Sequence, residues 1–336
     1  MSLCEHETIE ELLMDDMPID LTHIIEQVNS NPKSSWKASA QARFSNMSRK
    51  QIKKMMGTVV DPDWVVRAPN VKTADPALAI PTGFDTSVNW PNCASTVLLS
   101  RDQSDCGSCW AHGTTEAFND RKCIATNGTF QQLLSTADTA GCCDGTACLS
   151  FDCNGGQVAT PWRWFRTTGV VSGGPYGQGI YCYDYTMPMC AHHVTSDTLP
   201  PCDQVPTVAP GCYNTCQTNT TITYSTDKNK TVSNYGFGGD VAAIQQDIMT
   251  YGSVSGAFTV YEDFLTYTSG VYYHTTGASL GGHAIKIYGW GYDAASGMNY
   301  WICMNSWNNT WGMQGAFWIE MGNCGINNEV NAGHVF

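Results

Sequence analysis

The chain has 336 residues and a mass of 36.6 kDa, and 42% of its residues are hydrophobic. This is a globular composition, with enough length for a well-buried core and for two domains or a domain with an extension. The formal net charge is −13 and is carried mainly by residues 80–336, which argues against nucleic acid as a partner because its phosphates would be repelled. No run of 18 apolar residues occurs, so the sequence predicts no membrane span.

Residues 1–79 differ in charge from the rest of the chain. The first twenty residues are acidic and have no basic start followed by an apolar stretch, so we expect no secretory signal in them. Seven of the nine Lys/Arg of this region lie between Lys33 and Lys54. This basic stretch either docks on the acidic remainder of the chain or forms the solvated face of a helix, and the sequence leaves both interpretations open.

The first predicted helical region covers part of residues 22–56, with Ser48 as a cap and Gly57 as a stop for its last helix. A stretch rich in proline follows, and its prolines are Pro62, Pro69, Pro76 and Pro81. Because proline and the residue before it disfavour helix, this stretch is predicted to be an extended linker. We therefore expect a domain boundary near residue 80.

Further helices are predicted where apolar residues recur at helical spacing, at 109–125, 130–140, 159–167 and 241–251. In the first of them, Trp110, Phe118 and Ile124 are expected to share one buried face. The last is the best defined, because Asp240 supplies a cap and Gly252 an end.

Beyond residue 252 the apolar pattern changes to a period of two. The alternating segments, separated by Gly, Asn or Asp, are 253–261, 281–291, 299–307 and 315–321. This pattern is typical of an antiparallel sheet or barrel. A helical first half and a β-rich second half together predict an α+β fold.

The chain has sixteen cysteines, and nine of them are crowded in two groups, at 142–153 and 182–216, which predicts a disulfide framework and an oxidising compartment. Sequons for N-glycosylation agree with a secretory route, and they begin at Asn46, Asn127, Asn219, Asn229 and Asn308. Such triplets also arise often by chance, so they are weak support.

Cys106 and Cys109 form a C-x-x-C pair with three interpretations. A redox dithiol normally follows a strand in a small βαβ domain, and no such pattern is visible. A structural zinc site would need a second pair of cysteines, which an oxidising compartment would rather bond to each other. The third interpretation has one cysteine in a disulfide and the other as a thiolate at a helix start, with His283 as its partner and Asn305 to orient the histidine.

Several motifs then carry a family resemblance. They are CGSCW at 106–110, CNGG at 153–156, GGHA at 281–284, NSW at 305–307 and WG at 311–312. In this order they resemble the papain and cathepsin cysteine proteases, and the resemblance covers nearly all of residues 80–336. It implies an α+β, papain-like fold of two lobes, with a helical left lobe and an antiparallel, β-barrel-like right lobe.

Three further features resemble the cathepsin B branch of the family. IPTGFD at 80–85 and WPNC at 90–93 resemble the start of the mature enzyme, and residues 190–202 resemble its occluding loop. The resemblance therefore implies a propeptide at 1–79 and a peptidase domain at 80–336 with an insertion at 190–202.

The resemblance also implies roles for individual residues. Cys109 would be the nucleophile, His283 its proton-sharing partner and Asn305 the group that fixes the imidazole. Gln103, with the backbone N–H of Cys109, would form the oxyanion hole. Trp307 would shield the contact between His283 and Asn305 from water.

For substrate binding, the resemblance implies two glycines, Gly155 and Gly156, that let a substrate backbone lie close and pair in β fashion. Glu329 would be a carboxylate at the foot of the second-subsite pocket, where it would accept Arg as well as bulky apolar residues. Ala257 and Ala284 are also assigned to the substrate cleft by the resemblance.

His192 and His193 would bind the C-terminal carboxylate of a substrate and so favour removal of dipeptides. In the family the first histidine is tethered to an aspartate that matches Asp102. A second tether, an Arg to Asp ion pair, has no counterpart, because Leu199 and Thr310 stand at those positions. We expect a loop that opens more readily, with endopeptidase activity competing with dipeptide release.

A further departure is His112, where the family usually has Phe. Its ring would either pack as an apolar substitute or alter the local charge. By analogy, the resemblance implies six disulfides, which would leave Cys4, Cys303 and Cys324 unpaired. The implied pairs are Cys93 with Cys123, Cys106 with Cys153, Cys142 with Cys212, Cys143 with Cys148, Cys182 with Cys216 and Cys190 with Cys202.

The expected partners are peptide and protein substrates, cystatin-type inhibitors and the chain's own propeptide as an intramolecular inhibitor, with the protein a monomer. MMGT at 55–58 resembles the stretch that passes the nucleophile in the direction opposite to substrate. We expect acidification to weaken the grip of the propeptide by protonating carboxylates. No metal or cofactor is implied, and the expected location is a lysosome, another acidic vesicle or outside the cell.

Two other functions fit parts of the sequence. A catalytically silent relative that binds peptides would be expected to lack the nucleophile, the histidine or the glutamine, and all three are present. A secreted, disulfide-rich binding protein would explain the cysteines, but not the ordered set of Gln103, Cys109, His283 and Asn305.

Overall fold

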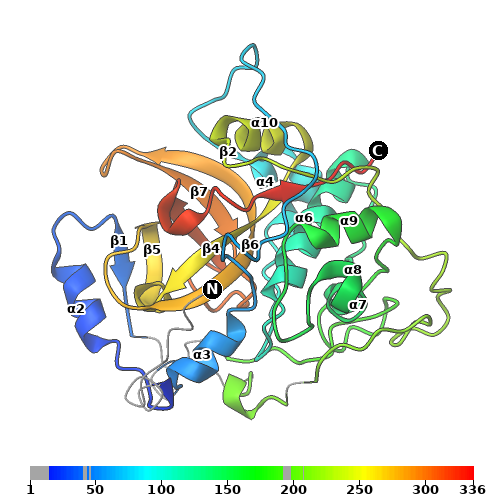
Figure 1. Ribbon diagram of the computed structural model, residues 1–336, viewed down its shortest axis with the longest axis horizontal. Helices are drawn as coiled ribbons and strands as arrows, with labels where there is room; N and C mark the ends of the chain where they lie inside the picture. The colour runs from blue at the N-terminus through cyan, green and yellow to red at the C-terminus, as the bar shows by residue number, and fades with distance from the viewer. Residues whose placement is uncertain (1–14, 41–43, 45–46, 192–197, 207) are drawn as a thin grey trace.

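The computed structural model describes residues 15–336 except 41–43, 45–46, 192–197 and 207. Helices α6 to α9 form one half of the molecule and the β-sheet forms the other, as Figure 1 shows. The described α-helices are α2 (Thr22–Ser30), α3 (Arg49–Met55), α4 (Thr86–Asn89), α5 (Ala94–Val97), α6 (Cys109–Ala125), α7 (Thr136–Cys142), α8 (Gly145–Cys148), α9 (Thr160–Thr167) and α10 (Val241–Tyr251). This division into helices and sheet confirms the α+β prediction.

The strands, in chain order, are β1 (Trp36–Ala38), β2 (Phe84–Asp85), β3 (Tyr235–Gly236), β4 (Val254–Tyr261), β5 (Tyr267–Tyr272), β6 (Ser279–Asp293), β7 (Met298–Met304), β8 (Ala316–Glu320) and β9 (Asn331–Ala332). They are ordered β1-β5-β8-β7-β6-β4-β9-β3, with β2 paired to β6. The sheet is open, with β1 and β3 at its two ends. Among these described strands the β5–β8 pair is parallel and the other pairs are antiparallel.

Helix α6 begins at Cys109 and covers the predicted range, but it is buried far more widely than one face. It packs between β6 on one side and α7 and α9 on the other. Gly113 allows this close approach, because a Cβ there would lie 2.9 Å from the carbonyl oxygen of Ile285 on β6. The site at the start of α6 is therefore held by the central strand of the sheet.

Helix ends follow the capping residues. Ser48 forms a capping box with Gln51 at α3, and Asp240 accepts from the N–H of Ala243 at α10. The helix predicted at 130–140 is displaced, because Ser135 is its N-cap and α7 runs from Thr136 to Cys142. Residues before the cap are extended, with a β-bridge from Leu134 to Ser172.

All six expected disulfides are present, and among the described residues Cys109, Cys303 and Cys324 are free thiols. Cys4 lies outside the described residues. Cys106 is bonded to Cys153, so the first cysteine of the C-x-x-C pair closes a loop and the second is free. This excludes a redox dithiol made of these two cysteines.

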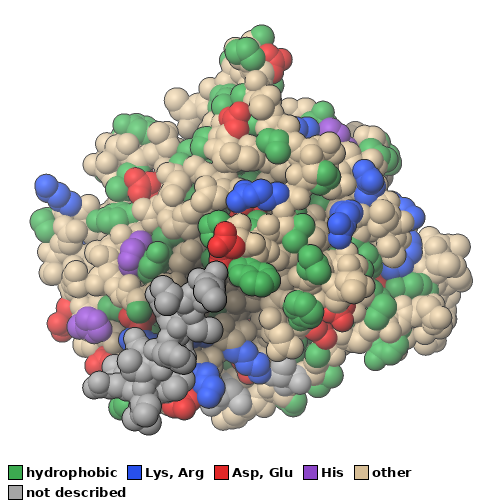
Figure 2. Space-filling model, in the orientation of Figure 1, with side chains coloured by type: hydrophobic (Ala, Val, Ile, Leu, Met, Phe, Trp, Pro, Cys, Tyr) green, Lys and Arg blue, Asp and Glu red, His purple; other side chains and the backbone are tan. Residues whose placement is uncertain are grey.

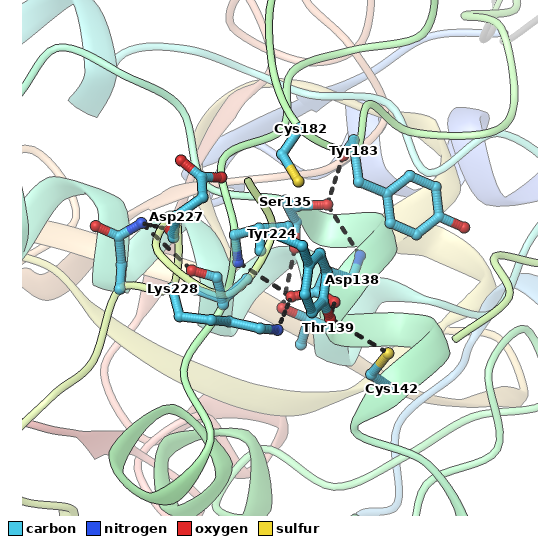
Figure 3. A network of polar contacts seen from close by, with 12 residues as sticks. Ser135, Asp138, Thr139, Cys142, Cys182, Tyr183, Tyr224, Asp227 and Lys228 are labelled. Atoms are coloured by element: carbon cyan, nitrogen blue, oxygen red, sulfur yellow. Dashed lines mark hydrogen bonds and ion pairs between the residues drawn. The ribbon is translucent and has the colours of Figure 1, made fainter. Parts of the chain in front are cut away.

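A buried carboxylate anchors the long connection before β3 to the helical half, as Figure 3 shows. Asp138 on α7 is fully buried and accepts hydrogen bonds from Lys228 Nζ and the hydroxyl of Tyr224, each at 2.7 Å. It also accepts from the backbone N–H of Val171. Because a buried charge is stable only when it is paired and hydrogen-bonded, these contacts fix residues 224–228 against α7.

Candidate active site

Cys109 is fully buried at the first position of α6, where the helix dipole favours a thiolate. Its Sγ lies 3.1 Å from the hydroxyl of Thr58, a residue of the N-terminal segment. Among the described residues no group of three or more His, Cys, Asp or Glu side chains is arranged to hold a metal ion. The geometry around Cys109 therefore favours the third interpretation, in which it is a reactive thiolate.

His283 and Asn305 come from neighbouring strands. His283 lies on β6, and Asn305 follows the end of β7, which pairs with β6. The Nε2 of His283 is 2.7 Å from the Oδ1 of Asn305, so Nε2 donates and the amide oxygen accepts. The indole of Trp307 covers this pair, with its ring centroid 5.0 Å from that of the imidazole.

The environment of Cys109 stabilises its ionised form. Burial raises the pKa of the thiol, but the charge and hydrogen bonding of His283 lower it more, with help from the Thr58 hydroxyl and the backbone N–H of Ala284. The net effect holds the pKa of Cys109 below its ordinary value. Because the Nε2 of His283 is bonded to Asn305, Nδ1 is the ring nitrogen that can share a proton with the sulfur.

Gln103 is fully buried and its side-chain amide is held at both ends. The hydroxyl of Ser306 donates to Oε1 at 2.6 Å. The Nε2 group donates to the carbonyl of Cys106 at 2.7 Å and to the carbonyl of Met55 at 3.0 Å. A peptide carbonyl of the N-terminal segment therefore accepts from the donor that the sequence analysis assigned to the oxyanion hole.

The N-terminal segment crosses the boundary between the two halves of the molecule after α3 (Figure 1). Thr58 N–H donates to Gly282 O on β6, and Val59 N–H donates to Gly156 O in the helical half. Gly156 N–H in turn donates to Gly57 O, so this segment is bonded to both halves. The bridge between Thr58 and Gly156 is parallel.

Three glycines lie at or beside this crossing. A Cβ at Gly57 would lie 1.8 Å from the carbonyl oxygen of Gly107, and a Cβ at Gly156 would lie 2.5 Å from Ser150 Oγ. Gly155 adopts a φ of 101°, which L side chains rarely adopt. Gly156 thus pairs with the backbone of Gly57 and Val59, and the role of Gly155 and Gly156 toward a substrate stays a prediction.

Glu329 and Ala257 line a cavity of about 210 Å³ together with Arg67 and Val60 of the N-terminal segment. Glu329 is buried, and its Oε1 lies 3.0 Å from Arg67 Nη1. Burial raises the pKa of Glu329, and the Arg67 charge partly offsets that rise. A guanidinium therefore already occupies the position expected for a basic substrate side chain.

The expected occluding loop is closed by the bond between Cys190 and Cys202, but His192 and His193 lie outside the described residues. Asp102 accepts from the N–H of Cys190 and from the Nδ2 of Asn308. Thr310 donates its hydroxyl to the Oδ1 of Asn308.

Because Asn308 is buried and its amide makes these bonds, the sequon at this position is not a site for a glycan. Asn127 is exposed, and Asn46 lies outside the described residues.

Part of the basic stretch between Lys33 and Lys54 contacts acidic residues of the rest of the chain. Arg49 pairs with Glu262 at 2.5 Å, and Lys54 approaches Asp105 at 4.0 Å. Lys50 and Lys53 instead pair with acidic residues of the same segment. Figure 2 shows basic side chains below the centre of this face, in the region where Figure 1 places α3. Docking and solvation therefore both occur along the stretch.

His112 packs as an aromatic side chain. Burial lowers its pKa to about 4, so the ring stays uncharged above that pH. Its Nδ1 lies 3.1 Å from Ser108 O, and its ring meets the ring of Tyr185 edge to face at 4.8 Å. This resolves the alternative that the sequence left open.

Ser306 and Arg67 were not predicted as site residues from the sequence, and Thr58 was predicted only as part of MMGT. Ser306 lies inside the NSW motif, but nothing in that motif indicates that its hydroxyl orients Gln103 across the two halves. Arg67 lies in the proline-rich stretch and has no local signal.

Comparison with known proteins gives the same assignment along most of the chain. Residues 81–334 match the model of the family described as papain family cysteine protease. The chain is 42% identical to cathepsin B-like cysteine proteinase 6 of Caenorhabditis elegans over 324 residues, covering 94% of this chain and 83% of that protein. It is 38% identical to a cathepsin B-like cysteine proteinase of Schistosoma japonicum, covering 92% and 89%.

Among solved structures, procathepsin B S9 from Trypanosoma congolense superposes with a TM-score of 0.77 at 27% identity, covering 94% of this chain and 98% of that one. Procathepsin L2 from Tenebrio molitor, at 20% identity and a TM-score of 0.69, shares the fold. No helix of the described residues has the length and apolar character needed to span a membrane.

Proposed function

Because the chain belongs to the papain family of cysteine proteases, among its cathepsin B-like members, we propose that it hydrolyses peptide bonds through Cys109 and is made as an inactive zymogen. The observation that carries this proposal is the contact of one segment with three groups. Residues 55–59 meet the sulfur of Cys109, the amide of Gln103 and the backbone of Gly156.

In the proposed reaction the sulfur of Cys109 bonds to the carbonyl carbon of the substrate, and the carbonyl oxygen takes the negative charge. The Gln103 amide and the Cys109 N–H stabilise that charge. As the C–N bond breaks, His283 gives its proton to the leaving amine. Water then attacks the thioester with His283 as base and releases the acid, while Asn305 holds the ring throughout.

The propeptide of this proposal is residues 1–79, followed by the peptidase domain at 80–336. Inhibition is supported by the Met55 carbonyl on the Gln103 amide and by the Thr58 hydroxyl on Cys109. With these groups in place, a substrate carbonyl has no access to the sulfur or to the Gln103 donor. Removal of the segment is therefore required for activity.

The substrate class follows from the cleft. Gly155 and Gly156 bind an extended peptide backbone, Ala257 and Ala284 are small residues of the cleft wall, and Glu329 accepts Arg at the second subsite. Trp307 keeps water from the pair of His283 and Asn305. Cystatin-type inhibitors are expected to compete for the same cleft, and the enzyme is expected to act as a monomer in an acidic vesicle, a lysosome or outside the cell.

We also propose both endopeptidase and dipeptide-releasing activity, with His192 and His193 binding the substrate carboxylate. Leu199 and Thr310 cannot form the ion pair that the resemblance implies at these positions, so we expect the loop to open more readily; its residues 192–197 lie outside the described residues. The ratio of dipeptide release to internal cleavage, measured at pH 5 on matched peptides with free and amidated C-termini, is expected to be low. Introducing an ion pair by Leu199→Arg with Thr310→Asp should raise it, and an unchanged ratio would contradict the proposal.

The test of the main proposal is labelling by an epoxide directed at catalytic cysteines, before and after incubation at acidic pH, with mass analysis of the adduct. We expect an adduct on Cys109 only after the propeptide has been removed. His283→Ala should abolish labelling at pH 5.5, and labelling of this variant should appear only at high pH, because the Ala284 N–H and the helix dipole are then the remaining groups that oppose the rise in thiol pKa caused by burial. No adduct after confirmed removal would favour a silent, peptide-binding relative.

A further inference from the structure

Residues 70–78, called the strap here, are docked on a surface that contains none of the residues assigned to the active site. Lys72 N–H donates to Gly236 O, and Gly236 N–H donates to Asn70 O, so the strap pairs with β3 at the end of the sheet. The side chain of Gln246 on α10 accepts from Asp75 N–H and donates to the carbonyls of Asp75 and Leu78.

Polar contacts dominate this docking. Val71 and Leu78 are 60% and 43% exposed, so burial of apolar side chains contributes little. Ala74 N–H donates to Asp240, which also caps α10. The strap therefore resembles an added edge strand that is held by backbone pairing and a few side chains.

Lys72 is the central side-chain contact. Its Nζ lies 2.7 Å from Asp247 Oδ2 and 2.8 Å from His334 Nε2. It also lies over the ring of Tyr235, 3.8 Å from the centroid. Asp247 is buried and is bonded to Arg121 as well as to the hydroxyl of Tyr235, so its charge remains paired when Lys72 leaves. Release of Lys72 therefore leaves the buried charge of Asp247 paired.

The contact between Lys72 and His334 fixes the protonation state of the histidine. An ammonium group can only donate, so His334 Nε2 must be an unprotonated acceptor. A proton on Nε2 would remove this bond and place two cations 2.8 Å apart. Docking of Lys72 and protonation of His334 at Nε2 are thus mutually exclusive.

We propose that the β3 edge, α10 and His334 form a second binding surface that holds residues 70–78 independently of the active site, and that protonation of His334 releases them. This pH-dependent release of the strap goes beyond the proposed peptidase activity and does not depend on it. It would free the strap on acidification even if the remainder of the N-terminal segment stayed in the cleft.

The charged groups that face His334 determine in which direction its pKa shifts when the strap is docked. Burial, Lys72 and Arg121 lower the pKa of His334, and Asp247 raises it by less. The rings of Tyr235 and Tyr251 pack on the imidazole and are uncharged.

The pKa of His334 is therefore below its ordinary value while the strap is docked, and it returns toward that value when Lys72 leaves. Docking is strongest above the ordinary histidine pKa of about 6.5 and weakens as the pH falls through it. Each unit by which the pKa of His334 differs between the docked and the released strap lowers the equilibrium constant for docking about tenfold at acidic pH.

The experiment uses the full chain with Cys109→Ser, which prevents self-cleavage, and hydrogen exchange of the amides of Lys72, Ala74, Asp75 and Gly236. Protection factors, corrected for the intrinsic pH dependence of exchange, are compared at pH 7.5 and pH 5. We expect protection at these amides to fall by about tenfold or more at pH 5, relative to amides of α6. Equal protection at the two pH values would overturn the proposal.

His334→Gln separates titration from structure, because the amide oxygen can still accept from Lys72 but cannot take up a proton at pH 5. This variant should keep the strap protected at both pH values, whereas Lys72→Met should leave it exposed at both. His274→Gln is the matched control, since His274 contacts Asp263 instead and should leave the pH response intact. A pH response that persists in His334→Gln, or a loss of protection at both pH values in that variant, would overturn the assignment.

Discussion

The hydroxyl oxygen of Thr58 lies 3.1 Å from the sulfur of Cys109, across 51 residues of chain. The carbonyl of Met55, three residues earlier, accepts from the amide of Gln103. Four consecutive residues of the N-terminal segment, 55–58, thus include contacts to both the candidate nucleophile and the candidate oxyanion donor. Its position depends on how closely the backbone can approach α6.

Gly57→Ala should weaken inhibition. A Cβ at this position would lie 1.8 Å from the carbonyl oxygen of Gly107, which is backbone and cannot rotate away, so residues 55–59 must shift. We expect Cys109 of the uncleaved chain to be alkylated at neutral pH at least about tenfold faster than in the parent, a change of about 1.4 kcal/mol. Gly83→Ala is the matched control, because its Cβ would meet nothing closer than 3.5 Å. Equal rates in the two variants would contradict the proposed restraint.

Ser306→Ala should reduce activity through Gln103. The Ser306 hydroxyl donates to the Gln103 oxygen at 2.6 Å, and this bond aims the amide N–H groups at the cleft. After propeptide removal, Gln103→Ala is expected to lower kcat by roughly 100-fold and Ser306→Ala by roughly tenfold, with KM nearly unchanged. The double variant should match Gln103→Ala alone, whereas additive losses would mean that Ser306 acts on another group.

Glu329→Gln should change substrate preference. The Glu329 carboxylate pairs with Arg67 at 3.0 Å, and a charge-assisted bond of this kind contributes about 1.5 to 3 kcal/mol. We expect kcat/KM for peptides with Arg at the second subsite to fall by about tenfold or more, while peptides with Phe there are cut as before. An equal loss on both substrates would indicate a folding defect and not a lost ion pair.

Glu116→Gln should stabilise the protein at neutral pH. Burial raises the pKa of Glu116 on α6 to about 7, despite the positive charges of Lys286 and Arg101. A carboxyl with a raised pKa keeps its proton in the folded state up to about pH 7, whereas the unfolded chain loses it above about pH 4.5. The cost of burying this group is therefore absent below pH 4.5, grows between pH 4.5 and 7, and is complete above pH 7.

The cost removed by Glu116→Gln at pH 7.5 is on the order of 3 kcal/mol at most. We expect a higher Tm for the variant than for the parent at pH 7.5 and nearly equal values at pH 5. The comparison is best made with both chains carrying Cys109→Ser. A variant that is less stable at both pH values would show that the buried carboxyl is needed for its contacts.

Local signals predicted the helix ends correctly where a capping residue is present, as at Ser48 and Asp240. They failed at α7, where Leu134 forms a β-bridge with Ser172, Ser135 is the N-cap and the helix starts at Thr136. Strand β1 was not predicted, because its three residues are too few to show the alternation of apolar and polar residues that indicates a strand. It forms because Trp36 packs on the rings of Tyr267 and Tyr272.

By itself the sequence determined the family, the division into a helical and a β-rich half, and, through the resemblance, the six disulfides and the candidate site residues. These depend on short motifs and on residue periodicity, which are local properties of the chain. The tertiary structure alone decided which residues of the N-terminal segment meet the site and what holds the strap. Thr58 on Cys109, Arg67 on Glu329 and Lys72 on His334 are contacts between residues 51 to 262 positions apart, so no local pattern encodes them, and they form only when the two halves have packed.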